Sequence, residues 1–357
     1  MPPRPVSNPP NPWLSGHVEW LGPPPAARLE VFEDQSREIL SRNDSPDVGF
    51  TWSANPYRGC QHACAYCYAR PYHEYLGYGA GTDFDTKVVV KPRAPELLRK
   101  AFARRTWRGE TVAFAGATDA WQPLEAAYRL TRGCLEVCLE HRNPVCVVTK
   151  AALLERDLDL LVALQREAGC AVSVSVPWLD VEVARRLEPL APSPARRIGT
   201  LARLVEAGLD PTVLVAPTVP GLDDELPRVL AAAAAVGVRR AGWQLLRLPG
   251  PVAGIFAERL REALPERAGR ILQLVRESRG GTLDDPRFHS RFRGEGPYAE
   301  AIAQVFRLTA RRLGLHVATP SAVRHPPGPD GVPQHGTFRR RGEAEDPAQQ
   351  SLFPFVR

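Results

Sequence analysis

Three cysteines crowd into one short segment of this 357-residue chain. Cys60, Cys64 and Cys67 stand in the run Cys-Gln-His-Ala-Cys-Ala-Tyr-Cys. Thiolates are soft ligands that select zinc or iron–sulfur clusters. Free cysteines often serve only as small buried apolar residues, but a segment that also holds glutamine and histidine is not typical of a core. The spacing therefore predicts a metal centre at residues 60–67.

Two kinds of metal centre fit three closely spaced thiolates. A zinc ion would take a fourth ligand, for which His62 or His73 is available. A cubane [4Fe–4S] cluster normally takes four thiolates, so three would leave one iron open to an external ligand. We favour the cluster, and a non-catalytic zinc-binding protein stays as the alternative.

The pattern Cys-x3-Cys-x2-Cys, with Tyr66 before the third cysteine, resembles the signature of the radical S-adenosylmethionine (radical SAM) superfamily. The resemblance implies an α/β fold with a partial (β/α)6 barrel and a [4Fe–4S] cluster on Cys60, Cys64 and Cys67. It implies that S-adenosylmethionine binds the open iron and is cleaved to methionine and a 5′-deoxyadenosyl radical, which abstracts hydrogen from the substrate. A one-electron donor such as flavodoxin or ferredoxin is implied as well.

The resemblance also assigns further residues to the cofactor. Tyr66 would lie near the adenine, and residues after the second strand would contact the methionine end through their backbone. A polar residue at the end of the fourth strand would contact the ribose, although serines in a strand are more often packing residues. The candidates are Tyr66, Gly116, Thr118, Asp119, Ser173 and Ser175.

Several segments are similar to the spore photoproduct lyase-like branch of this superfamily, among them residues 55–60, 67–70 and 188–194. The type enzyme of that branch repairs a thymine dimer in DNA and returns a hydrogen from a cysteine near the end of the second strand. This chain has Ala117 at the matching position. The resemblance therefore implies a radical enzyme that acts on a nucleic acid or nucleotide by a different reaction, and a small molecule or peptide is the alternative substrate.

The elements that must position these residues alternate between strand and helix. Short β-branched runs predict strands at 111–115, 145–148, 171–176, 212–215 and 241–246, and helical patterns fall at 125–141, 153–168, 195–207, 223–236 and 255–264. This alternation predicts a parallel sheet with its chemistry at the carboxyl ends of the strands. We expect a proline-rich arm at 1–48, a core domain at 49–320 and a flexible tail at 321–357.

Composition and charge add little about partners. The net charge is +6, but only four of the basic residues are lysines, which indicates a compositional bias more than a polyanion-binding surface. No apolar stretch approaches the ~20 residues of a membrane helix, and no apolar run follows Met1, so we expect a cytoplasmic protein. Near the C-terminus, Gln349, Leu352 and Phe353 resemble the peptide with which DNA-handling proteins bind the sliding clamp.

Overall fold

The computed structural model describes residues 28–114, 116–318 and 337–340. Its main element is an eight-stranded sheet in the order β11-β10-β9-β8-β7-β6-β3-β2. The strands are β2 (Leu40–Arg42), β3 (Trp52–Ala54), β6 (Val112–Phe114), β7 (Val145–Thr149), β8 (Cys170–Ser175), β9 (Thr212–Thr218), β10 (Arg240–Leu245) and β11 (His316–Val317). Neighbouring strands are parallel except for β2 and β3. Within the described residues the sheet runs from β2 to β11, and its parallel strands with connecting helices confirm the predicted α/β fold.

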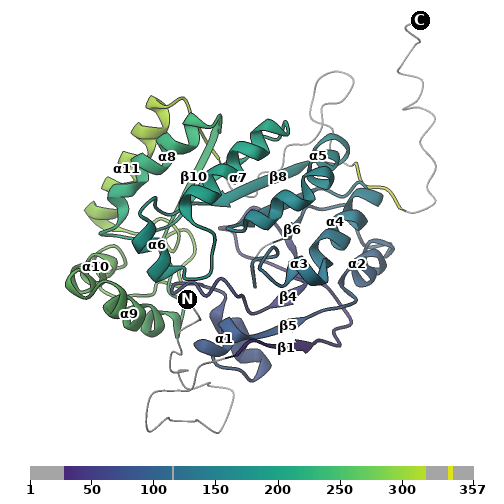
Figure 1. The fold of residues 1–357 in the computed structure, drawn as a ribbon, viewed down its shortest axis with the longest axis horizontal. Coiled ribbons are helices and arrows are strands. Elements are labelled where there is room, and N and C mark those ends of the chain that lie inside the picture. The colour runs from purple at the N-terminus through teal and green to yellow at the C-terminus, as the bar shows by residue number, and fades with distance from the viewer. Residues whose placement is uncertain (1–27, 115, 319–336, 341–357) are drawn as a thin grey trace, which may run out of the picture.

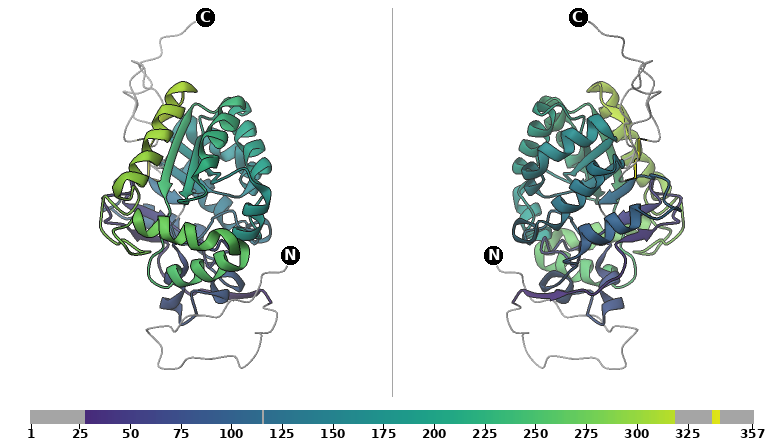
Figure 2. Two further views of the ribbon diagram at one scale, coloured as in Figure 1. Left: turned by 90° about the vertical axis from the view of Figure 1, so that its left-hand side faces the viewer. Right: turned by 90° about the vertical axis from the view of Figure 1, so that its right-hand side faces the viewer.

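Helices cover the outside of this sheet, and the strands lie within (Figures 1 and 2). The connecting helices are α4 (Leu130–Glu140), α5 (Leu158–Glu167), α7 (Pro194–Glu206), α8 (Leu226–Ala235) and α11 (Gly296–Arg312). On β8, Cys170, Val172 and Val174 pack into the large core shared with these helices. Ala171 belongs to a separate cluster of small residues with Ala113 and Cys146. Alternation along buried strands thus gives the sheet one densely apolar face and one face of small side chains.

A second, three-stranded sheet supports the cysteine segment. Its order is β1 (Glu30–Glu33), β5 (Lys87–Val90) and β4 (Tyr57–Arg58). The 3₁₀ helix η1 (Arg70–Leu76) and α1 (Thr82–Thr86) link β4 to β5. The other helices are α2 (Ala94–Phe102), α3 (Glu125–Tyr128), η2 (Ala152–Asp157), α6 (Val181–Leu187), η3 (Asp223–Glu225), α9 (Val252–Ala263) and α10 (Pro265–Glu277).

The predicted helix at 125–141 is in fact two helices, α3 and α4. The break falls at Arg129, which has a left-handed φ of 55°. Glu125 is fully buried, and its carboxylate accepts hydrogen bonds from the backbone N–H groups of Thr131 and Arg132. These N–H groups belong to the first turn of α4 and have no partner within the helix, so Glu125 caps the new helix.

The predicted domain boundaries stay predictions. β1 and β2 precede residue 48, and both pair with strands that follow it. Near the C-terminus, the ring of Phe338 packs against Phe102 and stacks on His141. Gln349, Leu352 and Phe353 lie outside the described residues. Among the helices that the structure describes, none is long and apolar enough to cross a membrane.

Candidate active site

The cysteine segment lies in the connection between β4 and η1. Cys60 and Cys64 are buried, Cys67 is partly buried, and all three are free thiols. The backbone N–H of Cys60 donates to the carbonyl of Phe84 over 2.9 Å, next to the small sheet. The three predicted ligands therefore lie in one largely buried loop.

Two arginines bind backbone carbonyls of this loop. Arg70 is fully buried and donates to the carbonyl of Cys64 from Nε and Nη2 over 3.1 and 2.8 Å. Arg259, on α9, donates to the carbonyl of Ala63 over 2.9 Å. Both guanidinium groups also bind Asp85, at 2.7 and 2.6 Å. A buried charge is costly without its partner, so these ion pairs hold the two arginines in place. The arginines in turn fix the positions of the loop carbonyls that they bind.

Residues after β6 hold the other side of the loop. The carbonyl of Gly59 accepts hydrogen bonds from Thr118 Oγ1 at 2.6 Å and from Gln122 Nε2 at 3.1 Å. Gln122 Oε1 in turn accepts from the N–H of Gln61 over 3.0 Å. Gly59 has a φ of 79°, and a Cβ there would lie 3.0 Å from the carbonyl oxygens of Phe84 and Lys87. Only glycine fits this approach of two backbone segments.

Asp119 joins the ends of β6 and β7. Its carboxylate accepts hydrogen bonds from Thr149 Oγ1 at 2.7 Å and from the Lys150 N–H at 2.8 Å, and it lies 3.4 Å from His62 Nδ1. Burial alone would raise the pKa of Asp119, but the charge and hydrogen bond of His62, together with the other donors, lower it to about 2. Asp119 is thus ionised, and its side chain is committed to protein contacts.

Tyr66 belongs to a buried polar network. Its hydroxyl donates to Glu188, which also pairs with the buried guanidinium of Arg197. The ammonium group of Lys150 lies 4.0 Å from Glu188 and 5.6 Å from the centre of the Tyr66 ring. Trp178 packs edge-on against Tyr66, with ring centres 6.0 Å apart.

Sequence reasoning missed Lys150, Glu188 and Arg197 as members of the site. Lys150 carried a usable signal, because it is one of only four lysines and directly follows the strand at 145–149. Chemistry in parallel sheets gathers at such strand ends. Glu188 begins the segment 188–194 that resembles the spore photoproduct lyase-like branch, but nothing marked it as a site residue, and Arg197 gave no signal, since charged residues near helices are ordinarily solvated.

The remaining predicted cofactor residues lie at the same end of the sheet. Ser173 and Ser175 are buried on β8 and share the alternation of Ala171, so they lie on the face of small side chains. Gly116 has a φ of 121° after β6. The following N–H, of Ala117, donates to Asn55 Oδ1 over 3.1 Å.

The donor set fits an iron–sulfur cluster. Burial raises the pKa of Cys64 to about 12, against the lowering effect of Lys150, and burial likewise raises the pKa of Cys60 and of Cys67. Neutral, enclosed thiols would ionise on binding metal, and the nearby Lys150, Arg70 and Arg197 would compensate the negative charge.

No group of three or more His, Cys, Asp or Glu side chains in the described part of the chain converges on one metal ion. A cubane does not require such convergence, because each thiolate binds a different iron. The two histidines weighed as zinc ligands have other neighbours: His62 lies beside Asp119, and His73 packs between the rings of Tyr78 and Phe84.

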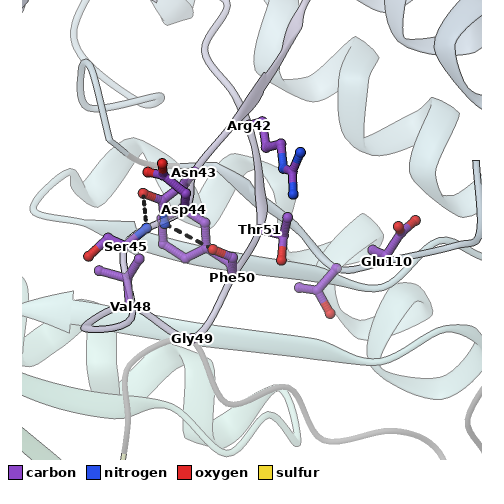
Figure 3. Close-up of a pocket in the computed structure, with 10 residues that line it drawn as sticks. Arg42, Asn43, Asp44, Ser45, Val48, Gly49, Phe50, Thr51 and Glu110 are labelled. Carbon is purple, nitrogen blue, oxygen red and sulfur yellow. Dashed lines mark hydrogen bonds between the residues drawn. The ribbon is translucent and has the colours of Figure 1, made fainter.

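An open polar pocket lies at the other end of the sheet (Figure 3). Its lining includes Thr51 and Thr111, which directly precede β3 and β6, and the loop in which Asn43 Nδ2 donates to the Phe50 carbonyl over 3.0 Å. This is the amino end of the parallel strands, whereas the cysteine segment and Asp119 lie toward the carboxyl end. We therefore assign the chemistry to the cysteine end.

Comparison with known proteins identifies the family of the chain. Residues 54–233 match the sequence family of the radical SAM superfamily. A protein of Mycobacterium tuberculosis, described only as uncharacterised, is 40% identical over 233 residues, which cover 64% of this chain and 68% of its own. A radical SAM Nα-GlyT isomerase of Pseudomonas phage M6 is 25% identical over 296 residues, covering 81% of this chain and 57% of its own.

Among solved structures, spore photoproduct lyase complexed with dinucleoside spore photoproduct shares the fold. Its TM-score is 0.57 at 16% identity, with 80% of this chain and 81% of that chain covered. The chain belongs to the radical SAM superfamily, whose members use a [4Fe–4S] cluster and S-adenosylmethionine. It is therefore an enzyme, and its parallel α/β sheet is the fold of that superfamily.

Proposed function

We propose that this radical SAM enzyme abstracts a hydrogen atom from a nucleotide unit of a nucleic acid. The observation that carries the proposal is the surface next to the cysteine segment. Tyr68 directly follows Cys67, and Tyr68, Tyr72 and Tyr75 are all exposed. Exposed aromatic side chains are the platforms on which unpaired bases stack. The dinucleoside spore photoproduct bound to the structural neighbour supports the same substrate class.

Within this proposal, Cys60, Cys64 and Cys67 hold the cluster. When bound, the cluster supplies the electron that cleaves S-adenosylmethionine to methionine and a 5′-deoxyadenosyl radical. Arg70 and Arg259 keep the loop carbonyls in place, and Thr118 and Gln122 hold Gly59. The chain thereby presents three thiols from a fixed loop.

We propose that residues 116–119 contact the cofactor through their backbone. The side chains of Thr118 and Asp119 already bind Gly59 and the loop after β7. Gly116 adds no side chain that would obstruct such a contact. Tyr66, Ser173 and Ser175 are assigned to the adenosine part of the same cofactor because they lie at the same end of the sheet.

Each cleavage of S-adenosylmethionine takes up one electron, so a one-electron donor is required, and flavodoxin or ferredoxin suits this role. We assign the enzyme to the cytoplasm because its seven free cysteines suit a reducing compartment. The clamp-binding peptide at Gln349, Leu352 and Phe353 stays a prediction. Unchanged binding to purified clamp after Leu352→Ala and Phe353→Ala would contradict it.

The first experiment is anaerobic reconstitution with iron and sulfide, followed by incubation with S-adenosylmethionine and dithionite. Formation of 5′-deoxyadenosine, lost in Cys64→Ala, is the expected result. Single-stranded and duplex oligodeoxynucleotides are then compared with peptides as additives. Faster formation of 5′-deoxyadenosine with an oligonucleotide supports a nucleic-acid substrate. Faster formation with peptides alone would contradict it.

A further inference from the structure

Arg247 lies at the carboxyl end of the sheet on a fixed backbone. It comes two residues after β10, between Leu246 and Leu248, which are buried in the same apolar cluster as Cys64 and Tyr66. The Leu246 N–H donates to the Thr218 carbonyl over 2.9 Å, and the Leu246 carbonyl accepts from Arg279 Nε over 3.0 Å. The position of Arg247 relative to the cysteine loop is therefore set by the core.

The guanidinium of Arg247 forms no hydrogen bond and no ion pair with the described residues, although Asp284 interacts with it electrostatically. Its Nε is buried without a hydrogen-bond partner, and Arg247 forms no ion pair there. Burial and the charge of Arg291 lower its pKa, while Tyr72, Asp284 and Tyr68 oppose this effect. A charged group that is partly buried and unpaired is costly, so proteins keep one mainly where a ligand supplies the missing partner.

Two tyrosines interact electrostatically with Arg247. Tyr68 and Tyr72 lie within electrostatic range of Arg247, and Tyr68 also lies in range of Cys67. Tyr72 is 45% exposed and Phe288 is 51% exposed. Arg291 stacks over Phe288 at 4.6 Å and is itself paired with Asp47. Of the two arginines, only Arg247 lacks an ion pair among the described residues, so it is the one that a ligand anion could pair with.

We propose that Arg247 binds a phosphate of the nucleic-acid substrate while Tyr72 stacks on an adjoining unpaired base. The inference rests on the proposed function and names a recognition subsite within it. An arginine suits phosphate because its planar donors match two oxygens at once. Because Leu246 and Leu248, on either side of Arg247, pack in the same apolar cluster as Cys64 and Tyr66, the bound nucleotide would lie near the cysteine loop.

The test measures binding of a fluorescein-labelled single-stranded oligodeoxynucleotide to the cluster-loaded protein by anisotropy, over a range of salt concentrations. Arg247→Ala is expected to weaken binding roughly tenfold at low salt and to reduce the salt slope by about 0.7, the value for one phosphate contact on a single strand. Arg247→Lys keeps the positive charge, so its affinity for the oligonucleotide should lie between those of the wild type and Arg247→Ala. Arg166→Ala is the matched control, because Arg166 is 76% exposed on α5.

Stability separates recognition from a structural role. Removing an unpaired guanidinium is expected to leave iron content and thermal unfolding unchanged, whereas a structural arginine would lower the unfolding temperature on removal. Tyr72→Ala is expected to weaken oligonucleotide binding as well. Tyr72→Leu should also bind the oligonucleotide more weakly than the wild type, whereas Tyr72→Phe should bind it with an affinity close to that of the wild type.

Three outcomes overturn the inference, and they differ in what else they overturn. Salt-dependent binding that Arg247→Ala leaves unchanged contradicts the phosphate contact but leaves the proposed function standing. Absence of any salt-dependent binding by the wild type contradicts both. Loss of S-adenosylmethionine binding in Arg247→Ala, with oligonucleotide binding intact, would show that Arg247 serves the cofactor. A nucleoside 5′-phosphate that competes only when Arg247 is present would instead support the phosphate site and place a free nucleotide in it.

Discussion

Arg70 and Asp85 form an ion pair of 2.7 Å in which neither side chain is exposed to solvent by more than 1%. Arg259 binds the second oxygen of the same carboxylate over 2.6 Å. Asp85 thus orients two guanidinium groups, and these donate to the carbonyls of Cys64 and Ala63. Helix α9, far along the chain, becomes part of the support of the cysteine loop.

Arg259→Ala is expected to make the cluster more labile without unfolding the protein. Asp85 keeps Arg70 as a partner, but the Ala63 carbonyl loses its donor. The rate of iron release to a chelator should rise severalfold, with thermal unfolding only slightly lowered. Arg261→Ala is the matched control, because Arg261 is exposed on the same helix. Equal rates of iron release in the two variants would contradict a positioning role for Arg259.

Glu188→Gln is expected to destabilise the fold strongly. Arg197 and Glu188 form an ion pair in which both side chains are almost fully buried. Removing one charge of a buried pair leaves the other uncompensated, at a cost of about 3–5 kcal/mol in the free energy of unfolding. Urea unfolding measures this loss. Glu182→Gln, at an exposed ion pair with Arg185, should change the free energy of unfolding by less than about 1 kcal/mol.

His73 gives the stability a pH dependence in mild acid. Burial lowers the pKa of His73 from 6.5 to about 4, against the opposing charges of Asp83 and Asp85. Between pH 6.5 and 4 the unfolded chain binds a proton that the folded chain excludes, so stability falls as the pH is lowered through this window. The contribution is about 3 kcal/mol and is fully present above pH 6.5.

The check compares wild type with His73→Phe, which keeps an aromatic ring between Tyr78 and Phe84. The difference in free energy of unfolding between pH 7 and pH 5 should be smaller in the variant. An identical pH dependence in both proteins would show that another group titrates.

Replacing Cys60, Cys64 or Cys67 by alanine is expected to abolish iron retention and 5′-deoxyadenosine formation. Cys134→Ala is the control, because Cys134 is fully buried in the large core and should only leave a small cavity there. Iron and sulfide content after anaerobic reconstitution is the measurement. A loss of iron in Cys134→Ala equal to that in Cys64→Ala would make the ligand assignment wrong.

Much of this protein could be predicted from its sequence. The crowding of Cys60, Cys64 and Cys67 is a local pattern, and a loop metal site needs only local spacing. The strands near 112, 145, 171, 212 and 241 could be located because continuous β-branched runs are typical of strands buried on both faces. The alternation of these strands with helices indicated a parallel sheet. A parallel sheet in turn indicated that the chemistry occurs at the carboxyl ends of the strands.

Only the tertiary structure decided what surrounds the cysteines. Arg259 lies nearly 200 residues from Ala63, and Glu188 lies 122 residues from Tyr66, so no local pattern could pair them. The sequence does not distinguish Arg70, fully buried and paired, from Arg247, whose Nε is buried without a hydrogen-bond partner among the described residues. The cost or value of a charge depends on its burial and its neighbours, and both arise only when distant segments fold together.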